Sequence, residues 1–325
     1  RGGMIIQTMN TTTPQHPAAG AEPSLHGIAP LHHLGIIKIE GEDAAKFIHG
    51  QLTHDFSLLD LGTARLAAFC SAKGRMQASF IGFKRSTTEI LLICSLDILP
   101  ATLKRLSMFV MRAKAKLSDA SAAYTLYGLL GDATKPIASQ AYPAWAKVDS
   151  DTSTWVNLYP ANGVPRQLWV APVGTPAPQG QILSQDLWLW TEVRSGIATI
   201  SAPVVEAFVP QMLNYESVGG GNFKKGCYPG QEVVARSQFR GTLKRRAFVV
   251  HADASMTAGK EVFAANDESQ PVATVVQAAP APQGGFEAIV SAQLSAVESS
   301  TLHLGSNTGP ALRILPLPYA LLDDI

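Results

Sequence analysis

Apolar residues are arranged in two different ways along the first third of the chain. Apolar runs typical of strands occur at 34–40, 63–70, 76–83, 89–94 and 114–117. Between these runs, apolar residues recur every three or four positions after residue 43 and over 96–112, as on a helix with one buried face. Strands and helices mixed in this way predict an α+β or α/β core.

The middle of the chain predicts a second lobe of the same kind. Runs typical of strands lie at 124–130, 154–159 and 167–173, separated by polar stretches that contain proline. Apolar residues then recur at helical spacing over 183–194, with Trp188 on a different face from Trp190. Taken alone, these two tryptophans are typical of core or interface positions rather than of ligand contacts.

Beyond residue 246 the pattern changes to short strands only. Six runs typical of strands follow one another at 247–251, 261–265, 272–277, 286–292, 301–304 and 312–315. Gly, Pro, Asp, Asn and Ser lie between them, so a small antiparallel barrel or sandwich is predicted. We therefore expect a core over 26–240 and a β-barrel over 241–325. Residues 1–25, rich in Thr, Pro, Ala and Gly, predict a disordered leader.

Composition adds few constraints to this picture. The 325 residues are 46% hydrophobic and 16% charged with a net charge of +1, which is typical of a globular protein and gives no general case for nucleic-acid binding. Cys70, Cys94 and Cys227 lie far apart, so neither a disulfide framework nor a CxxC metal site is predicted. A reducing compartment, the cytoplasm, is expected. No apolar run is long enough to span a bilayer.

Charge gathers in one stretch, residues 222–246. Seven basic residues stand there against a single acid, Glu232. The basic residues are Lys224, Lys225, Arg236, Arg240, Lys244, Arg245 and Arg246. This local positive field suits an anion or a thiolate, and Cys227 lies inside it.

The residues around Cys227 predict a turn followed by a short helix. Pro and Gly occupy the two central positions of 228–231, as a type II turn prefers. Glu232, Arg236 and Arg240 then recur at the four-residue spacing of one helix face. The predicted helix N-terminus, with Lys224 and Lys225, would favour a thiolate. A reactive thiol and an inert cysteine in a tight turn both remain open.

Several motifs together resemble a known family. The sequence K-G-C-Y-P-G-Q-E at 225–232, extended through V-V-A-R and F-R-G-T-L-K-R-R, closely resembles the signature of the YgfZ branch of the folate-binding superfamily. That superfamily also contains the aminomethyltransferase T-protein of the glycine cleavage system. Further matching motifs lie at 50–55, 71–76, 208–214 and 315–319. The resemblance runs from about residue 30 to the end.

The resemblance implies a fold and a function. It implies an α+β, ring-like arrangement of three lobes, in which a two-part folate-binding core and a C-terminal antiparallel β-barrel surround a central channel. It also implies a tetrahydrofolate-type ligand and a role in assembling or repairing iron–sulfur clusters, including those of tRNA-modifying enzymes. The partners would then be iron–sulfur apoproteins or assembly factors.

The resemblance also assigns residues. Cys227 matches the functional thiol, and Trp188 matches a tryptophan that contacts folate, against the interpretation from the residues alone. Leu34 stands where some members have an aromatic contact. The remaining residues expected at the cofactor are Lys224, Lys225, Tyr228, Gln231, Glu232 and Arg236.

Two departures separate this chain from the T-protein. No acid lies at 75–78, where the T-protein has its catalytic carboxylate, so the general acid–base group for aminomethyl transfer is missing. Arg194 replaces a Glu of many relatives, although Glu192 is near. We therefore expect an accessory protein with little or no enzymatic activity.

Two alternatives remain open. One is a tetrahydrofolate-dependent one-carbon transferase in which Asp55 or Glu232 replaces the lost acid. The other is an RNA-binding module that uses the basic residues of 236–246, although the few aromatic residues there disfavour it. The histidines do not predict a metal site, because no carboxylate or cysteine lies at ligand spacing from them.

Overall fold

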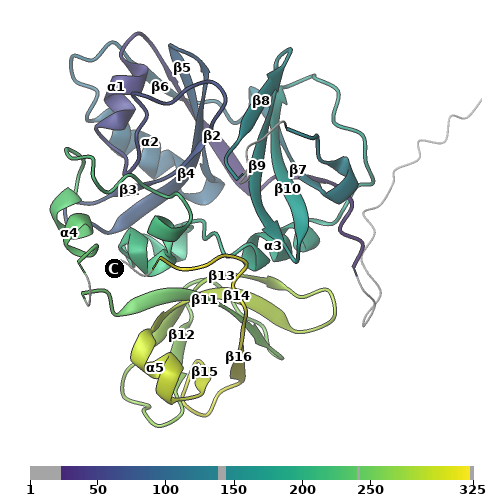
Figure 1. Cartoon of the computed structure of the whole chain (residues 1–325), viewed down its shortest axis with the longest axis vertical. Helices are drawn as coiled ribbons and strands as arrows, with labels where there is room; N and C mark the ends of the chain where they lie inside the picture. Colours follow the sequence, from purple (N-terminus) through teal and green to yellow (C-terminus); the bar gives the residue numbers. More distant parts are fainter. Residues whose placement is uncertain (1–22, 138–143, 240–241, 323–325) are drawn as a thin grey trace, which may run out of the picture.

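The computed structural model describes residues 23–137, 144–239 and 242–322. Figure 1 shows three lobes: two sheets lie side by side and a barrel lies below them. The predicted class, α+β with a closed antiparallel barrel, is confirmed. Within the described ranges, no helix is long and apolar enough to cross a membrane.

The first lobe is a five-stranded antiparallel sheet with the order β3-β4-β5-β2-β6. Its strands are β2 (Leu34–Glu40), β3 (Arg65–Cys70), β4 (Met76–Ser86), β5 (Glu89–Ser95) and β6 (Lys116–Asp119). The helices of this lobe are α1 (Ala44–His49) and α2 (Leu99–Ser107), the latter preceded by a 3-10 turn at Leu96–Ile98. Ile37, Ile39 and Phe80 of the sheet are fully buried in a cluster with Ile48 of α1 and Leu106 of α2.

The second lobe is a sheet with the order β1-β7-β10-β9-β8. Its strands are β1 (Gly27–Pro30), β7 (Tyr124–Leu130), β8 (Lys147–Ser150), β9 (Ser153–Ala161) and β10 (Val164–Pro172). A 3-10 turn at Gly131–Ala133 follows β7. The chain thus enters the second lobe through β1 before it builds the first. Residues 1–22 of the predicted leader lie outside the described residues, whereas Leu25 is buried in the core.

Helix α3 (Gln185–Arg194) lies between the sheets and the barrel (Figure 1). Its first turn is capped by Ser184, whose Oγ accepts a hydrogen bond of 3.2 Å from the Leu187 N–H. Trp188 and Trp190 are both buried, so the helix has no solvent face at its centre. This explains why the sequence showed apolar residues on more than one face.

The barrel is closed, with the order β11-β14-β13-β12-β15-β16. Its strands are β11 (Arg245–Ala252), β12 (Glu261–Ala264), β13 (Ala273–Pro280), β14 (Phe286–Gln293), β15 (Leu302–Leu304) and β16 (Ala311–Leu315). A short helix, α5 (Leu294–Ser299), follows β14. All six strands correspond to predicted runs, and closure leaves no sheet edge exposed. The domain boundary at residue 240 stays a prediction.

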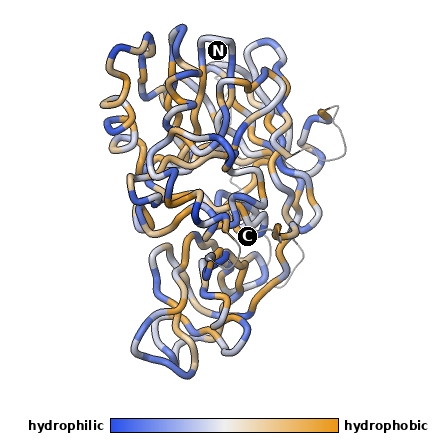
Figure 2. Tube along the Cα trace, turned by 60° about the vertical axis from the view of Figure 1, so that its left-hand side comes forward, coloured by the Kyte–Doolittle hydropathy of each residue, from blue (hydrophilic) through white to orange (hydrophobic). Residues whose placement is uncertain are grey.

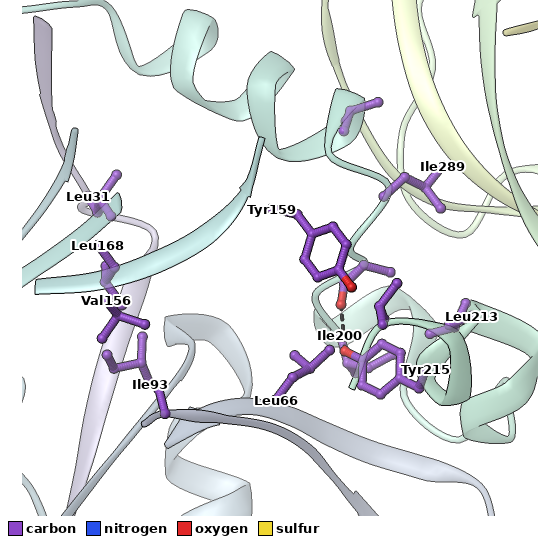
Figure 3. Packing of buried hydrophobic residues seen from close by; sticks show 14 of the residues in the cluster. Leu31, Leu66, Ile93, Val156, Tyr159, Leu168, Ile200, Leu213, Tyr215 and Ile289 are labelled. Carbon is purple, nitrogen blue, oxygen red and sulfur yellow. Dashed lines mark hydrogen bonds between the residues drawn. The ribbon is translucent and has the colours of Figure 1, made fainter. Parts of the chain in front are cut away.

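One hydrophobic cluster joins the three lobes. Figure 3 shows Leu66 of β3, Val156 of β9 and Ile289 of β14 in the same cluster. Tyr215 belongs to it too, and its hydroxyl donates a 2.6 Å hydrogen bond to the Ala198 carbonyl. In Figure 2, hydrophilic positions mark the outer loops and hydrophobic ones follow the strands between them. The lobes therefore pack as one body.

Two connections complete the fold. Short 3-10 turns lie between α3 and the next helix, at Ala202–Val204, Pro210–Leu213 and Tyr215–Ser217. After β16 the chain leaves the barrel and returns to the core, where the Tyr319 hydroxyl donates 2.8 Å to the Gly196 carbonyl. The last residues of the predicted barrel segment therefore contact α3's C-terminal end.

Candidate functional site

A cavity of about 50 Å³ lies between the two sheets and α3. Its wall includes Ser79 of β4, Tyr159 of β9, Arg166 of β10, and Trp188 and Glu192 of α3. This space is enough for a few water molecules. Polar groups in an otherwise apolar wall are typical of a ligand site.

Glu192 is the carboxylate of this cavity. Its side chain is 13% exposed and accepts hydrogen bonds from His33 Nε2 at 3.0 Å, Trp188 Nε1 at 2.9 Å and Gln277 Nε2 at 3.1 Å. Burial alone would raise its pKa, but His33, Arg166 and the hydrogen bonds hold the pKa of Glu192 below its usual value. Burial opposes protonation of His33, yet Glu192 raises the pKa of that imidazole overall. The pair is therefore ionic in mildly acidic solution.

Arg166 covers the Trp188 ring. Its guanidinium carbon lies 4.6 Å from the ring centroid, its Nη1 donates 2.9 Å to the Tyr159 carbonyl, and its Nε donates 3.2 Å to Thr191 Oγ1. Burial lowers the pKa of Arg166 to about 10 against the charge of Glu192, so the group stays cationic at neutral pH. The indole also lies against Gly128 of β7, where an added Cβ would meet it at 2.5 Å.

Two of the predicted site residues, Trp188 and Leu34, line this cavity. The two acids of the transferase alternative, Asp55 and Glu232, do not. Arg194 points to the barrel, where its Nη1 donates 2.9 Å to Glu287 Oε1, and Glu192 faces the cavity instead.

The other seven predicted residues lie around a different feature, which we call the thiol loop (residues 219–230), and the helix α4 (Gln231–Arg236) that follows it. The Asn222 N–H donates 2.9 Å to the Thr53 carbonyl, and Thr53 Oγ1 donates 2.9 Å to the Gly220 carbonyl. Gly230 lies so close to Ser71 that a Cβ there would stand 2.3 Å from the Ser71 carbonyl oxygen. The motifs at 50–55, 71–76 and 225–232 thus meet in space.

Cys227 is exposed and has a left-handed backbone with φ of 64°. The turn behind it has the predicted form: Gly230 has φ 77° and ψ 6°, and the Gln231 N–H donates 3.1 Å to the Tyr228 carbonyl. The predicted helix is confirmed as far as Arg236, whereas Arg240 lies outside the described residues. A non-glycine residue with positive φ is uncommon and often marks a functional position.

The charged side chains near Cys227 differ in burial and in their contacts. Lys225 Nζ donates to the His49 carbonyl and lies 5.0 Å from the Tyr228 ring centroid. Burial lowers the pKa of Lys225, although the charges of Asp55 and Cys227 raise it in part. Lys224 is exposed, as are Glu232 and Arg236, and Gln231 is half-buried. Of the two lysines that precede Cys227, Lys225 is therefore the one that the fold holds in place.

The predicted basic patch is divided. Arg246 is buried and paired with Glu216, and Arg245 is half-buried. Only part of the positive charge is thus available to a polyanion. Across the described ranges, no group of three His, Cys, Asp or Glu side chains could hold a metal ion. The other two thiols are buried, and burial raises the pKa of both Cys70 and Cys94 to about 12.

Sequence reasoning missed several polar residues of the cavity region, among them His33, Arg166 and Thr191. A signal existed for Arg166, because it is a lone charge at the start of an apolar strand. His33 and Thr191 carried no such signal, since their partners come from distant parts of the chain.

No family model matches the sequence. The structure is similar to the crystal structure of glycine cleavage system aminomethyltransferase T from Bartonella henselae, with a TM-score of 0.66 and 14% identity over 92% of this chain and 87% of that one. A heterotetrameric sarcosine oxidase from Corynebacterium sp. U-96, in complex with pyrrole 2-carboxylate, matches with a TM-score of 0.30 and 14% identity over 45% and 74%. The first similarity shows that the chain has the fold of aminomethyltransferase T.

Proposed function

We propose that this protein binds a tetrahydrofolate-type ligand in the cavity beside Trp188 and Glu192 and supports iron–sulfur cluster assembly or repair through the Cys227 thiol. The observation that carries the proposal is the separation of the two features. A polar cavity lies inside an aminomethyltransferase fold, while the exposed thiol projects from a loop docked elsewhere. Such a division suits an accessory protein that holds a ligand and contacts a partner.

The side chains of the cavity offer the types of contact that a reduced pterin needs: a hydrogen-bond acceptor and flat apolar surfaces. A carboxylate has about four acceptor positions, and Glu192 uses three of them, which leaves one for a ligand N–H. Trp188 and Tyr159 supply flat apolar walls. The present space of about 50 Å³ is well below the roughly 300 Å³ of a ligand site. Binding therefore requires the wall to move outward.

One-carbon transfer is not the function we propose. Transfer needs a group that gives or takes a proton at the folate amine. Glu192 is the carboxylate that faces the cavity, and its pKa is held low by His33 and Arg166. It is thus a poor general acid. Asp55 accepts the Leu58 N–H at 2.9 Å and does not reach the cavity wall.

The iron–sulfur part of the proposal is supported by the resemblance of 225–232 to the YgfZ signature and by the exposure of Cys227. An exposed thiol beside a lysine can contact an apoprotein or a cluster in transit. The RNA-binding alternative has weaker support, because Arg246 is buried. We keep the cytoplasm as the expected location, since all three cysteines are free thiols.

Complementation tests the role of the thiol. A strain that lacks its YgfZ-type protein receives the wild-type gene, Cys227→Ser or Cys227→Ala, with Ser295→Ala, at an exposed position of the barrel helix α5, as the control for a substitution remote from both the loop and the cavity. We expect rescue by the wild type and the control, measured as activity of iron–sulfur enzymes. Full rescue by both Cys227 variants would remove the thiol from the function. A wild-type gene without effect would remove the iron–sulfur assignment.

Calorimetric titration with tetrahydrofolate tests the cavity separately. Trp188→Phe should weaken binding about tenfold, because the indole N–H that orients Glu192 is lost. Trp155→Phe is the matched control, since Trp155 contacts Lys135 on another surface. Equal affinities of the wild type and Trp188→Phe would separate Trp188 from the site.

A further inference from the structure

Arg166 is a buried cation that makes no ion-pair contact with a carboxylate of the described residues, although Glu192 acts on its pKa. Its residue is 4% exposed, and no Asp or Glu oxygen in the described ranges lies within 4.0 Å of its guanidinium. A buried charge without an ion pair is expensive unless hydrogen bonds or a ligand compensate it. The stacking contact with Trp188 compensates only in part.

Two of the three guanidinium nitrogens are occupied. Nη1 donates to the Tyr159 carbonyl and Nε to Thr191 Oγ1. These two bonds, together with the Trp188 ring, fix the plane of the group. Nη2 has no partner among the residues that the structure describes, and Arg166 lines the cavity. A rigidly held donor thus remains for something inside the cavity.

Glu192 lines the same cavity as Arg166 and influences its pKa, but the two are not in ion-pair contact. The cavity therefore carries a donor on one part of its wall and an acceptor on another. A flat heterocycle with a ring oxo group next to ring N–H groups matches both at once. In an analogue with an amino group in place of the oxo group, that amino group, itself a hydrogen-bond donor, would face the donor Nη2 of Arg166.

We propose that Arg166 is a specificity-determining residue: its Nη2 donates to the oxo oxygen of the bound heterocycle while the adjacent ring N–H faces Glu192. This inference rests on the proposed folate-type ligand and names the edge by which it is recognised. The site discriminates through an unpaired donor, because the wrong ring leaves the guanidinium uncompensated.

The test compares two ligands on full-length protein by calorimetry: tetrahydrofolate and the analogue that carries an amino group in place of the ring oxo group. The wild type should prefer the oxo compound by about tenfold or more, as expected for one hydrogen bond to a charged donor. The analogue also lacks the ring N–H next to the oxo group, which faces Glu192, so Arg166→Met should lower the preference several-fold without abolishing it. Arg166→Lys keeps the positive charge but lacks the planar guanidinium with its several donors. Its preference for the oxo compound over the amino analogue should therefore be intermediate.

Arg85→Met is the matched control, because Arg85 also lies over an aromatic ring, Tyr124 at 5.4 Å, but is not part of the cavity wall. It should keep the wild-type ratio. Thermal melts identify any variant that does not fold. If Arg166→Met does not fold, the ligand preference of Arg166→Lys is compared with that of the wild type instead. An unchanged ratio in folded Arg166 variants means that the arginine only braces Tyr159 and Trp188, and overturns the inference while folate binding stands. A wild type that binds neither compound overturns the proposed function itself, and this inference with it.

Discussion

Cys227 holds a backbone conformation that residues other than glycine rarely adopt, with φ of 64°. The left-handed region costs a residue with a Cβ about 1–2 kcal/mol. Cys227→Gly removes that strain, whereas Cys227→Ala keeps it. We expect the Gly variant to have the larger free energy of unfolding, by about 1 kcal/mol, in urea titrations of the two proteins.

The stabilities of Cys227→Gly and Cys227→Ala can also contradict this expectation. If the Ala variant is as stable as the Gly variant, the conformation at this position stores no strain. A positive outcome would mean that the fold keeps a cysteine where glycine would be more stable, as expected when the thiol is needed for function.

The three thiols should differ in reactivity towards iodoacetamide. Cys70 and Cys94 are buried, and their pKa of about 12 leaves almost no thiolate near neutral pH. Cys227 is exposed. Peptide mass spectrometry after brief labelling should find the label on Cys227 alone. All three should react in denaturant, and early labelling of Cys70 in the native protein would contradict the packing described.

At the scale of the element, helix α3 contacts the cavity on one face and the barrel on another. Each contact is made by two side chains four residues apart. Trp188 and Glu192 face the cavity, whereas Trp190 Nε1 donates 2.8 Å to Glu287 of the barrel and Arg194 contacts the same carboxylate. The sequence predicted this helix and the separate face of Trp188. The spacing alone did not predict which face lines the cavity, because a helix buried on several sides has no single apolar stripe.

Two short strands were not predicted. These are β1 and β8, with four residues each. β1 is defined by its pairing with β7, about a hundred residues away in the chain. The turn and helix around Cys227 were predicted well, because Pro229 and Gly230 encode them locally.

The stability of the α3 region should depend on pH through His33 and Glu192. The pKa of His33 is raised above 6.5 in the folded state, so its contribution is full below 6.5 and is lost as the pH rises through the folded value. The pKa of Glu192 is lowered below 4.5, so its contribution is present above 4.5 and is lost as the pH falls through the folded value. The pair therefore stabilises the fold most between these limits.

Urea titrations of the wild type and His33→Gln check this dependence. The difference in free energy of unfolding should be largest in mildly acidic solution and shrink as the pH rises through the folded pKa of His33. His32→Gln is the control, because exposed His32 has no ion pair in the described ranges. A difference that does not change with pH would mean that the contact with Glu192 is not ionic.

At the scale of the molecule, the three lobes are bound together by segments that cross between them. Arg246 of the barrel strand β11 is buried against Glu216 of the core. Asn214 Nδ2 donates 2.9 Å to the Ala247 carbonyl of the same strand. The three lobes follow from the sequence and its resemblance, but these crossing contacts do not. They join residues about thirty positions apart without any local signal.

The C-terminal segment after β16 is the last such crossing, and Tyr319 anchors it. Its hydroxyl donates 2.8 Å to the Gly196 carbonyl and accepts 3.1 Å from Asn214 Nδ2, while its ring packs edge-on against Tyr159 with centroids 5.7 Å apart. Tyr319→Phe keeps the ring and leaves both partners without the hydroxyl, which should lower the free energy of unfolding by about 1–3 kcal/mol.

Urea titration measures this loss, and Tyr127→Phe is the matched control, because the Tyr127 hydroxyl makes no hydrogen bond within the described ranges while its ring packs against Trp169. Since Tyr159 lines the cavity and the Phe ring still supports it, the affinity for tetrahydrofolate should stay within about threefold of the wild type. Equal stability of the two variants would mean that the segment adds packing alone. Lost affinity in Tyr319→Phe would instead show that the hydroxyl's bonds, which join the C-terminal segment to α3, also hold the cavity in shape.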